Sequence, residues 1–88
     1  MDYQIIHLKE DHRFEVRIGD DIAYVEYTLH DDNLDIEHTF VPKQLGGQGL
    51  AGALVKEAYD YALAHNLKPV ATCSYAVAWL ERHPEYKR

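Results

Sequence analysis

The middle of the chain reads Gln44-Leu45-Gly46-Gly47-Gln48-Gly49-Leu50-Ala51. Residues before this stretch alternate between apolar and polar, as in a strand, and residues after it follow the period of a helix. Its glycines permit positive φ and leave no Cβ between the backbone and a ligand. A glycine-rich turn between a strand and a helix also leaves unpaired N–H groups at the positive end of the helix dipole. The stretch therefore predicts an anion-binding loop that opens a helix.

The sequence before this loop predicts a series of antiparallel strands. Phe14, Val16 and Ile18 alternate with charged residues, which is the period-two pattern of a strand with one buried face. Polar turns separate this run from the next two, and Pro42 ends the last one because it removes a ladder donor. The predicted strands are residues 5–8, 14–18, 22–29 and 34–41. Alternation in the last strand places on one face Leu34, Ile36, His38 and Phe40, and on the other Asp35, Glu37, Thr39 and Val41.

After the loop the sequence predicts a helix, a strand and a second helix. The first helix is expected to run from Leu50 to near Asn66, which tolerates the left-handed conformation at a helix end. Residues 70–73 predict a short buried strand, and Ser74 is expected to cap a second helix that ends near His83. The expected apolar stripe of the first helix is Leu50, Ala53, Leu54, Ala58, Tyr61 and Ala62. The expected fold is α+β, a mainly antiparallel sheet with two helices packed on it.

Length and composition predict one globular domain over residues 1–88. Hydrophobic residues make up 47% and charged residues 27%, which is ordinary for a globular protein. The net charge of −6 repels nucleic acid. A single cysteine, Cys73, forbids an intramolecular disulfide, and no apolar run approaches the ~20 residues of a membrane span. We therefore expect a cytoplasmic protein without a nucleic-acid or membrane partner.

The spacing of the glycines sets aside two common phosphate-binding loops. A Walker loop ends in Gly-Lys-Ser/Thr, whereas this chain has Gly49-Leu50-Ala51 and no side chain there for phosphate or magnesium. Gly47, Gly49 and Gly52 match the letters of a dinucleotide fingerprint. That fingerprint belongs to a parallel unit, and the strands predicted before this loop are antiparallel. The bound anion is therefore expected to be of another kind.

The pattern Gln44-x-x-Gly47-x-Gly49, between a strand and a helix, resembles motif A of the GCN5-related N-acetyltransferases. Three further segments extend the resemblance to the very small, single-domain branch of predicted acetyltransferases called YjdJ-like. These segments are Glu37-His38-Thr39-Phe40-Val41-Pro42, Cys73-Ser74-Tyr75 and Arg82-His83-Pro84-Glu85-Tyr86. The resemblance covers most of the chain, and it implies an N-acetyltransferase that uses acetyl-CoA as the acetyl donor.

The resemblance also implies which residues hold the cofactor. The loop would bind the pyrophosphate, the strand over residues 34–41 would pair its edge with the pantetheine arm, and the strand over residues 70–73 would splay away from it. The cofactor-binding residues implied in this way are Thr39, Phe40, Val41, Gln44, Leu45, Gly46, Gly47, Gln48, Gly49, Leu50, Ala51, Cys73 and Tyr75.

The chain departs from the family's pattern on the acceptor side. Larger relatives insert two helices between the first strands and add C-terminal strands that wall the acceptor site, and neither fits in 88 residues. An open acceptor side suits a small amine, a lysine side chain or a protein terminus. It also suits a non-catalytic module that binds CoA or another protein, so this alternative function stays open.

Two residues of the strand before the loop are candidates for the general base. His38 is the first candidate, because an imidazole with an ordinary pKa of ~6.5 accepts a proton at neutral pH. Its expected place beside Leu34 and Ile36 is equally typical of a hydrogen-bonded core histidine. Glu37, on the expected opposite face, is the second candidate, and otherwise an ordinary solvated carboxylate.

Cys73 and Tyr75 are the remaining catalytic candidates. Cys73 ends the splayed strand and is expected to be inert packing, because the resemblance implies direct transfer in a ternary complex; acetylation of its thiol is the alternative. Tyr75 resembles in position the tyrosine that protonates the CoA thiolate in many relatives. A half-buried aromatic clamp is an equally good interpretation of Tyr75.

No metal is expected in this chain. A zinc site needs histidine, cysteine or carboxylate ligands at short, characteristic spacings. The histidines lack such spacing; they are His7, His12, His30, His38, His65 and His83.

Overall fold

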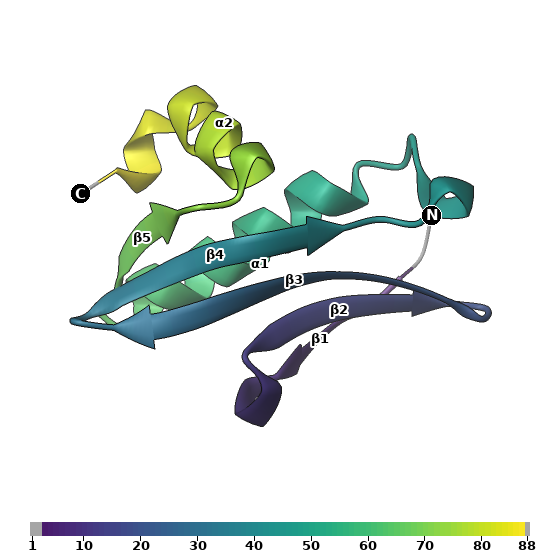
Figure 1. Cartoon of the computed structure of the whole chain (residues 1–88), viewed down its shortest axis with the longest axis horizontal. Helices are drawn as coiled ribbons and strands as arrows, with labels where there is room; N and C mark the ends of the chain where they lie inside the picture. Colours follow the sequence, from purple (N-terminus) through teal and green to yellow (C-terminus); the bar gives the residue numbers. More distant parts are fainter. Residues whose placement is uncertain (1–2, 88) are drawn as a thin grey trace.

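The structure is a computed structural model that describes residues 3–87 (Figure 1). Within these residues, five strands form one sheet in the order β1-β2-β3-β4-β5. The strands are β1 (Ile5–Leu8), β2 (Arg13–Ile18), β3 (Asp21–His30), β4 (Asn33–Phe40) and β5 (Lys68–Ala71). The helices are α1 (Leu50–Ala64) and α2 (Ser74–Arg82), with 3₁₀ turns η1 (Lys9–Asp11), η2 (Lys43–Leu45) and η3 (Pro84–Tyr86). The predicted α+β fold and its element order are confirmed.

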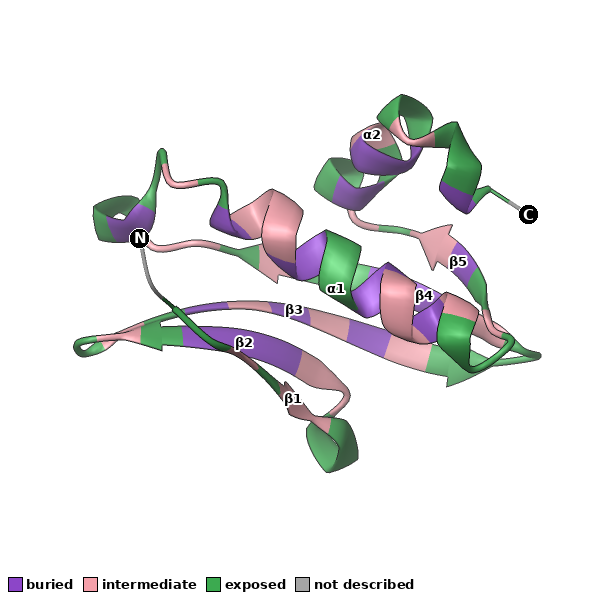
Figure 2. Cartoon of the chain, turned by 180° about the vertical axis from the view of Figure 1, so that it is seen from behind, coloured by how far each residue is buried: buried purple, intermediate pink, exposed green. Residues whose placement is uncertain are grey.

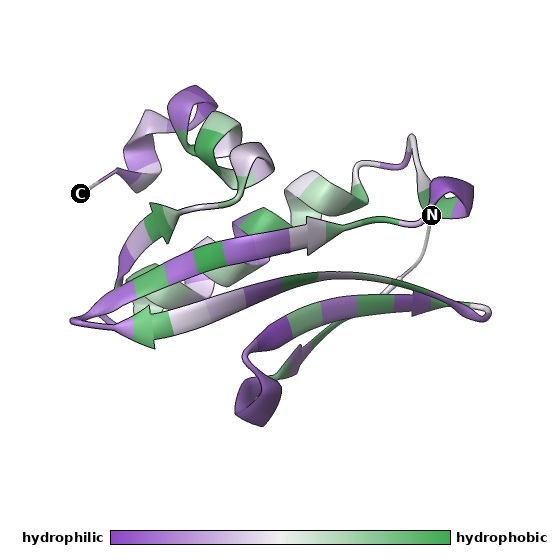
Figure 3. Cartoon of the chain, in the orientation of Figure 1, coloured by the Kyte–Doolittle hydropathy of each residue, from purple (hydrophilic) through white to green (hydrophobic). Residues whose placement is uncertain are grey.

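The two faces of the sheet differ in what covers them. The strands from β1 to β4 pair antiparallel, and β5 pairs parallel to β4. Helix α1 packs on one face and contacts β2, β3, β4 and β5, so the core lies between this helix and the sheet (Figure 2). Along β2, hydrophobic residues alternate with charged ones, which points one set of side chains at α1 (Figure 3). The opposite face of β2, β3 and β4 carries mainly polar and charged side chains.

Helix α2 packs at the edge of the sheet formed by β5. It contacts β5, β4 and α1, and it buries Ala76, Trp79 and Leu80. The Trp79 ring lies 5.8 Å from the ring of Tyr59 on α1. Because α2 covers a second side of α1, that helix buries Val55 and Tyr59, which lie outside the predicted stripe.

Strand β5 pairs with the first half of β4 only. Their pairing runs from Asn33 opposite Lys68 to Ile36 opposite Ala71. The last bonds between them are those from the N–H groups of Thr72 and Cys73 to the carbonyl of Ile36. The chain then turns into α2, so no strand among residues 3–87 pairs with this edge of β4 over residues 37–40. The strand predicted over residues 70–73 is Lys68–Ala71, and the edge of β4 is free because this strand ends there rather than because it splays.

A β-bulge in β4 reverses the predicted faces of its second half. Ile36 lies opposite Tyr27 and His38 opposite Glu26, which leaves Glu37 as the extra residue. Beyond the bulge Thr39 lies opposite the buried Val25, so it points toward the helix. The prediction that His38 and Phe40 share a face with Leu34 and Ile36 was wrong, because one inserted residue shifts the alternation. Both His38 and Phe40 are exposed.

One helix end was predicted correctly and one was not. The N-cap of α2 is Cys73 rather than Ser74, and no side chain caps this helix. Helix α1 ends at Ala64, near the predicted Asn66, which takes the expected left-handed conformation with a φ of 60°. Glu15 alternates with the core residues of β2 but is only 1% exposed, because it lies between Arg13 and Arg17.

Candidate functional site

The glycine loop between β4 and α1 presents unpaired backbone donors. Gly47 and Gly49 have φ of 82° and 73°, and a Cβ at either position would meet nothing within 4 Å. Glycine is needed there for its backbone freedom, and the space beside it is open to a ligand. The first bonded N–H of α1 is that of Ala53, which donates to Gly49 at 3.0 Å. Among residues 3–87 no backbone carbonyl accepts from the N–H groups of residues 47–52.

Leucines hold both ends of this loop in the core. Leu45 is 5% exposed and Leu50 is 1% exposed, so they contribute backbone rather than side chain to any ligand site. The intervening Gly46 and Gly47 are exposed, and so is Gln44. The loop is therefore fixed at its ends and open in its middle.

Gln48 carries an unsatisfied buried oxygen. Its Oε1 atom is inaccessible to solvent and has no hydrogen-bond partner among the described residues. A buried acceptor without a donor is uncommon in folded proteins and calls for a physical explanation. Because the atom is closed off from solvent, a ligand could donate to it only after the Gln48 side chain moves.

Cys73 and Thr39 meet across the gap beyond the end of β5. The Cys73 Sγ lies 3.5 Å from the Thr39 Oγ1, and the bulge is what turns Thr39 toward it. Burial opposes ionisation of the thiol, but hydrogen bonds from Thr39 and from the first backbone N–H groups of α2 outweigh it. The pKa of Cys73 is therefore below the ordinary value of a thiol.

Tyr75 lies against the first turn of α1. A Cβ added to Gly52 would come within 3.3 Å of the Tyr75 hydroxyl and 3.9 Å of Trp79 Nε1. Glycine at this position leaves room for the hydroxyl just beyond the loop. The Tyr75 side chain stays 41% exposed, so its hydroxyl is not locked in the core.

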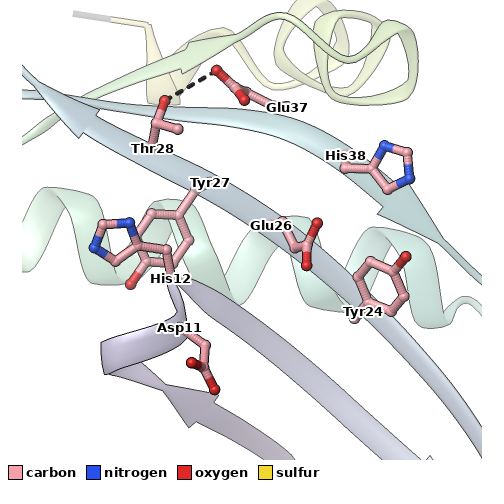
Figure 4. A pocket seen from close by; sticks show the side chains of 8 residues that line it. All are labelled: Asp11, His12, Tyr24, Glu26, Tyr27, Thr28, Glu37 and His38. Carbon is pink, nitrogen blue, oxygen red and sulfur yellow. Dashed lines mark hydrogen bonds between the residues drawn. The ribbon is translucent and has the colours of Figure 1, made fainter.

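Glu37 and His38 line a hollow on the exposed face of the sheet (Figure 4). This open-face hollow has a volume of about 460 Å³. Glu37 Oε2 accepts a hydrogen bond from Thr28 Oγ1 at 3.2 Å, and the His38 ring lies 6.1 Å from that of Tyr24. Its lining includes Asp11, Tyr24, Glu26, Thr28, Glu37 and His38. The two predicted base candidates thus share one face of the sheet, contrary to the prediction.

The structure therefore sorts the predicted residues into two groups. Thr39, Cys73 and Tyr75 gather with the loop on the side of the helices, and Val41 packs against the core nearby. On the other face, Phe40 is 46% exposed beside Tyr24, at 5.6 Å between rings. Sequence reasoning missed Asp11, Tyr24, Glu26 and Thr28, because nothing in their own pattern marks them. The pairing of β3 with the bulged β4 brings them beside Glu37.

Residues 3–87 contain no group of three or more histidine, cysteine or acidic side chains arranged to hold a metal ion. Within the same range, no helix is both long and apolar enough to cross a membrane.

Comparison with known proteins decides the family. A family model described as GCN5-related N-acetyl-transferase matches residues 13–88. The chain belongs to this family. The assignment to the YjdJ-like branch remains a prediction.

Individual proteins resemble the chain over most of its length. Protein NATD1 of Xenopus tropicalis is 30% identical over 84 residues, which are 92% of this chain and 77% of that protein. Protein NATD1 of Gallus gallus is 31% identical, over 92% of this chain and 76% of that protein. The solution structure of a GCN5-like protein from Staphylococcus aureus superposes with a TM-score of 0.74 at 31% identity, over 94% of this chain and 82% of that one. The fold is thus a minimal form of the GCN5-related acetyltransferase fold.

Proposed function

We propose that this chain is an acetyl-CoA-dependent N-acetyltransferase that transfers the acetyl group to an amine by direct attack. One observation carries the proposal: the free N–H groups of residues 47–52 lie at the end of β4, the strand whose edge is unpaired over residues 37–40. A free strand edge followed in the chain by N–H groups that can bind an anion suits a ligand with an extended amide arm and a phosphate group. Membership of the family supports the same donor.

The residues present fit acetyl-CoA in three respects. The N–H groups of the loop and of the first turn of α1 would donate to the pyrophosphate, which the missing Cβ atoms of Gly47 and Gly49 let approach. The free edge of β4 would bond the amides of the pantetheine arm as an added strand does. Lys43, in η2 just before the glycines, adds a positive charge beside the loop in the chain.

Different side chains near the end of β4 would act as the general base and the general acid. Acetyl-CoA supplies a thioester that loses its acetyl group to the amine and releases a thiol. Backbone N–H groups of β4 would polarise the thioester carbonyl. His38, exposed on the open face, takes the proton from the attacking amine, and the Tyr75 hydroxyl provides one for the leaving sulfur. Glu37 is the alternative base, from the same hollow.

Cys73 is assigned to the wall of the thioester site rather than to a covalent step. Its lowered pKa makes its thiol more reactive than a buried cysteine, so the assignment needs a direct test. Intact mass after incubation with acetyl-CoA should show the unmodified chain. A stoichiometric acetyl adduct that disappears in Cys73→Ala would replace direct attack with an acyl-enzyme route.

A thermal-shift measurement with matched glycine variants tests the donor site. Acetyl-CoA at 100 times Kd should stabilise the fold by about 2.7 kcal/mol. Gly47→Ala should largely abolish this gain, because alanine is strained at a φ of 82° and its Cβ would stand on the ligand side. Gly19→Ala is the control, since Gly19 has a φ of 61° and equal space but lies in the β2–β3 turn, outside the glycine loop. The absence of any acetyl-CoA effect on the unmodified chain would refute the donor site.

Turnover separates the enzyme from a non-catalytic CoA-binding module. Release of CoA should depend on an added amine and fall at least about tenfold in His38→Ala and in Tyr75→Phe, as expected for a lost acid or base. Suitable controls are His30→Ala and Tyr3→Phe, at exposed positions away from the site. Binding of acetyl-CoA without turnover across a broad panel of amines and peptides would favour the module.

A further inference from the structure

The open-face hollow borders the proposed catalytic strand, β4, on the sheet face opposite α1. Its walls are Asp11 and His12, at the end of η1, and Glu37 with His38 on β4. Its floor is β3, through Tyr24, Glu26, Tyr27 and Thr28 (Figure 4). A volume of about 460 Å³ is sufficient for a small aliphatic molecule or a long side chain.

Most charges on this face are already paired. Arg13 binds Glu26 at 2.7 Å and Glu15 at 3.4 Å, and Arg17 also binds Glu15. These two arginines and two glutamates therefore neutralise each other. The Arg13 guanidinium also covers the Tyr24 ring at 4.0 Å, so the face of this aromatic ring already carries one cation.

Two carboxylates of the hollow have no positive partner. Within residues 3–87, neither Asp11 nor Glu37 forms an ion pair, and the one side-chain partner of Glu37 is the neutral Thr28 hydroxyl. They stand on different walls, one beside η1 and one at the bulge of β4. The hollow thus offers two separated negative charges to an incoming molecule.

The bulge joins this hollow to the proposed donor site. It places Glu37 and His38 on the open face and Thr39, the next residue, beside Cys73 on the other. Consecutive residues of β4 therefore border the hollow and the gap expected to hold the thioester. An acceptor nitrogen bound beside His38 on the open face would be separated from that gap only by β4.

We propose that the open-face hollow is the acceptor site and that it takes aliphatic amines bearing a second positive charge. The reacting nitrogen lies between Glu37 and His38, and the second ammonium group lies near Asp11. Since aliphatic amines have a pKa of ~10.4, both nitrogens arrive charged, and the reacting one must lose a proton. The ammonium first gives one proton to water, and the neutral nitrogen then bonds the acetyl carbon while the carbon–sulfur bond breaks. As the amide forms, the nitrogen passes its second proton to His38, the sulfur takes a proton from Tyr75, and Tyr75 regains one from water. The acetyl-transfer step rests on the proposed function, whereas binding of the amine in the hollow does not depend on it.

A binding titration tests the site without any need for turnover. The probes are 1,5-diaminopentane, the neutral 1,5-pentanediol and the peptide acetyl-Lys-Lys-amide, followed through the amide resonances of isotope-labelled protein. The diamine should produce saturable shifts centred on residues 11, 26, 37 and 38, and about 0.5 M salt should weaken them. The diol should produce none. A response to the peptide alone would identify lysine side chains of a protein as the source, and a response to the diamine alone would identify free diamines.

Variants that remove one charge each test whether diamine binding depends on the two carboxylates. Asp11→Asn and Glu37→Gln should each weaken diamine binding about threefold, in the range of a partly exposed ion pair. Glu57→Gln, an exposed carboxylate on α1, should leave it unchanged. No saturable shifts for either cationic probe, shifts centred elsewhere, or equal affinity in all three variants would overturn the proposal.

The same sample separates this proposal from the proposed function. Acetyl-CoA stabilisation without amine binding in the hollow would leave the donor site standing and refute the acceptor site. Amine binding without any acetyl-CoA effect would refute the transferase and leave a hollow for cationic amines. The two results are measured independently, so each proposal is judged by its own measurement.

Discussion

The two faces of the sheet are built on the same strands but differ in their energetics. The covered face buries Val25, Ile36 and Leu54 completely between the strands and α1. The open face carries the ion pairs of Arg13 and Arg17 with Glu15 and Glu26, and it leaves His38 exposed. The proposed donor residues gather at the end of the covered side, and the proposed acceptor hollow lies on the open side. The fold thus derives its stability from one face and leaves the other free to receive an acceptor.

The largest expected difference between the faces is in core stability. Leu54→Ala removes a fully buried side chain of α1 and should lower the free energy of unfolding by about 2–5 kcal/mol. Ile22→Ala, on the open face at 36% exposure, should cost less than about 1 kcal/mol because little apolar area is lost. Urea denaturation of both variants measures the difference. Equal costs would mean that the open face is covered in solution, for instance by a second copy of the chain.

The next effect concerns the junction where the pairing of β5 with β4 ends. Asp35 is buried there, and the Thr72 hydroxyl donates to its two carboxylate oxygens, which lie at 2.8 and 3.0 Å. Thr72→Val leaves this carboxylate without that donor and should cost about 1–3 kcal/mol. Thr28→Val removes a hydroxyl from an exposed bond to Glu37 and should cost much less. Similar losses in the two variants, measured by urea denaturation, would contradict the difference in burial.

Gly52→Ala separates stability from activity on the covered side. Alanine favours a helix interior by about 1 kcal/mol over glycine, so the melting temperature should hold or rise. The new Cβ would press on the Tyr75 hydroxyl at 3.3 Å and displace it, so turnover should fall several-fold. In a Tyr75→Phe background the same change should have no effect on turnover. A full loss in both backgrounds would mean that Gly52 acts independently of Tyr75.

The smallest expected effect is a pH dependence at the β1 edge. Burial lowers the pKa of His7, and the nearby Lys9, His65 and His12 lower it further. The unfolded chain therefore binds a proton near the ordinary pKa of 6.5 while the folded chain does not, so stability falls as the pH drops below about 6.5. The fall should be shallower in His7→Gln, measured by urea denaturation at several pH values. Parallel curves for the two proteins would exclude His7 as the cause.

The sequence predicted the elements and the loop because their signals are local. Glycines that need positive φ stand where the period changes from two to 3.6, and both features can be recognised without knowing any contact. The resemblance to the acetyltransferase family rested on the same short segments. Comparison with known proteins confirmed it.

The parts that escaped prediction depend on contacts between distant segments. The bulge at Glu37 follows from how β4 pairs with β3, so strict alternation put His38 in the core and Thr39 outside. Burial of Tyr59 requires α2 to pack on α1, and Glu15 is covered only because Arg13 and Arg17 lie across it. The open-face hollow combines η1, β3 and β4 and has no sequence signature of its own.

The most direct test of the account is a titration of isotope-labelled protein with acetyl-CoA, followed through its backbone amide resonances. Saturable shifts should be largest for residues 47–52 and for Thr39 and Cys73, and small for residues 11 and 26 on the open face. That result would place the acetyl donor between the glycine loop and the free edge of β4. An absence of saturable shifts, or shifts centred on the open face, would contradict the central claim that the two faces serve different partners.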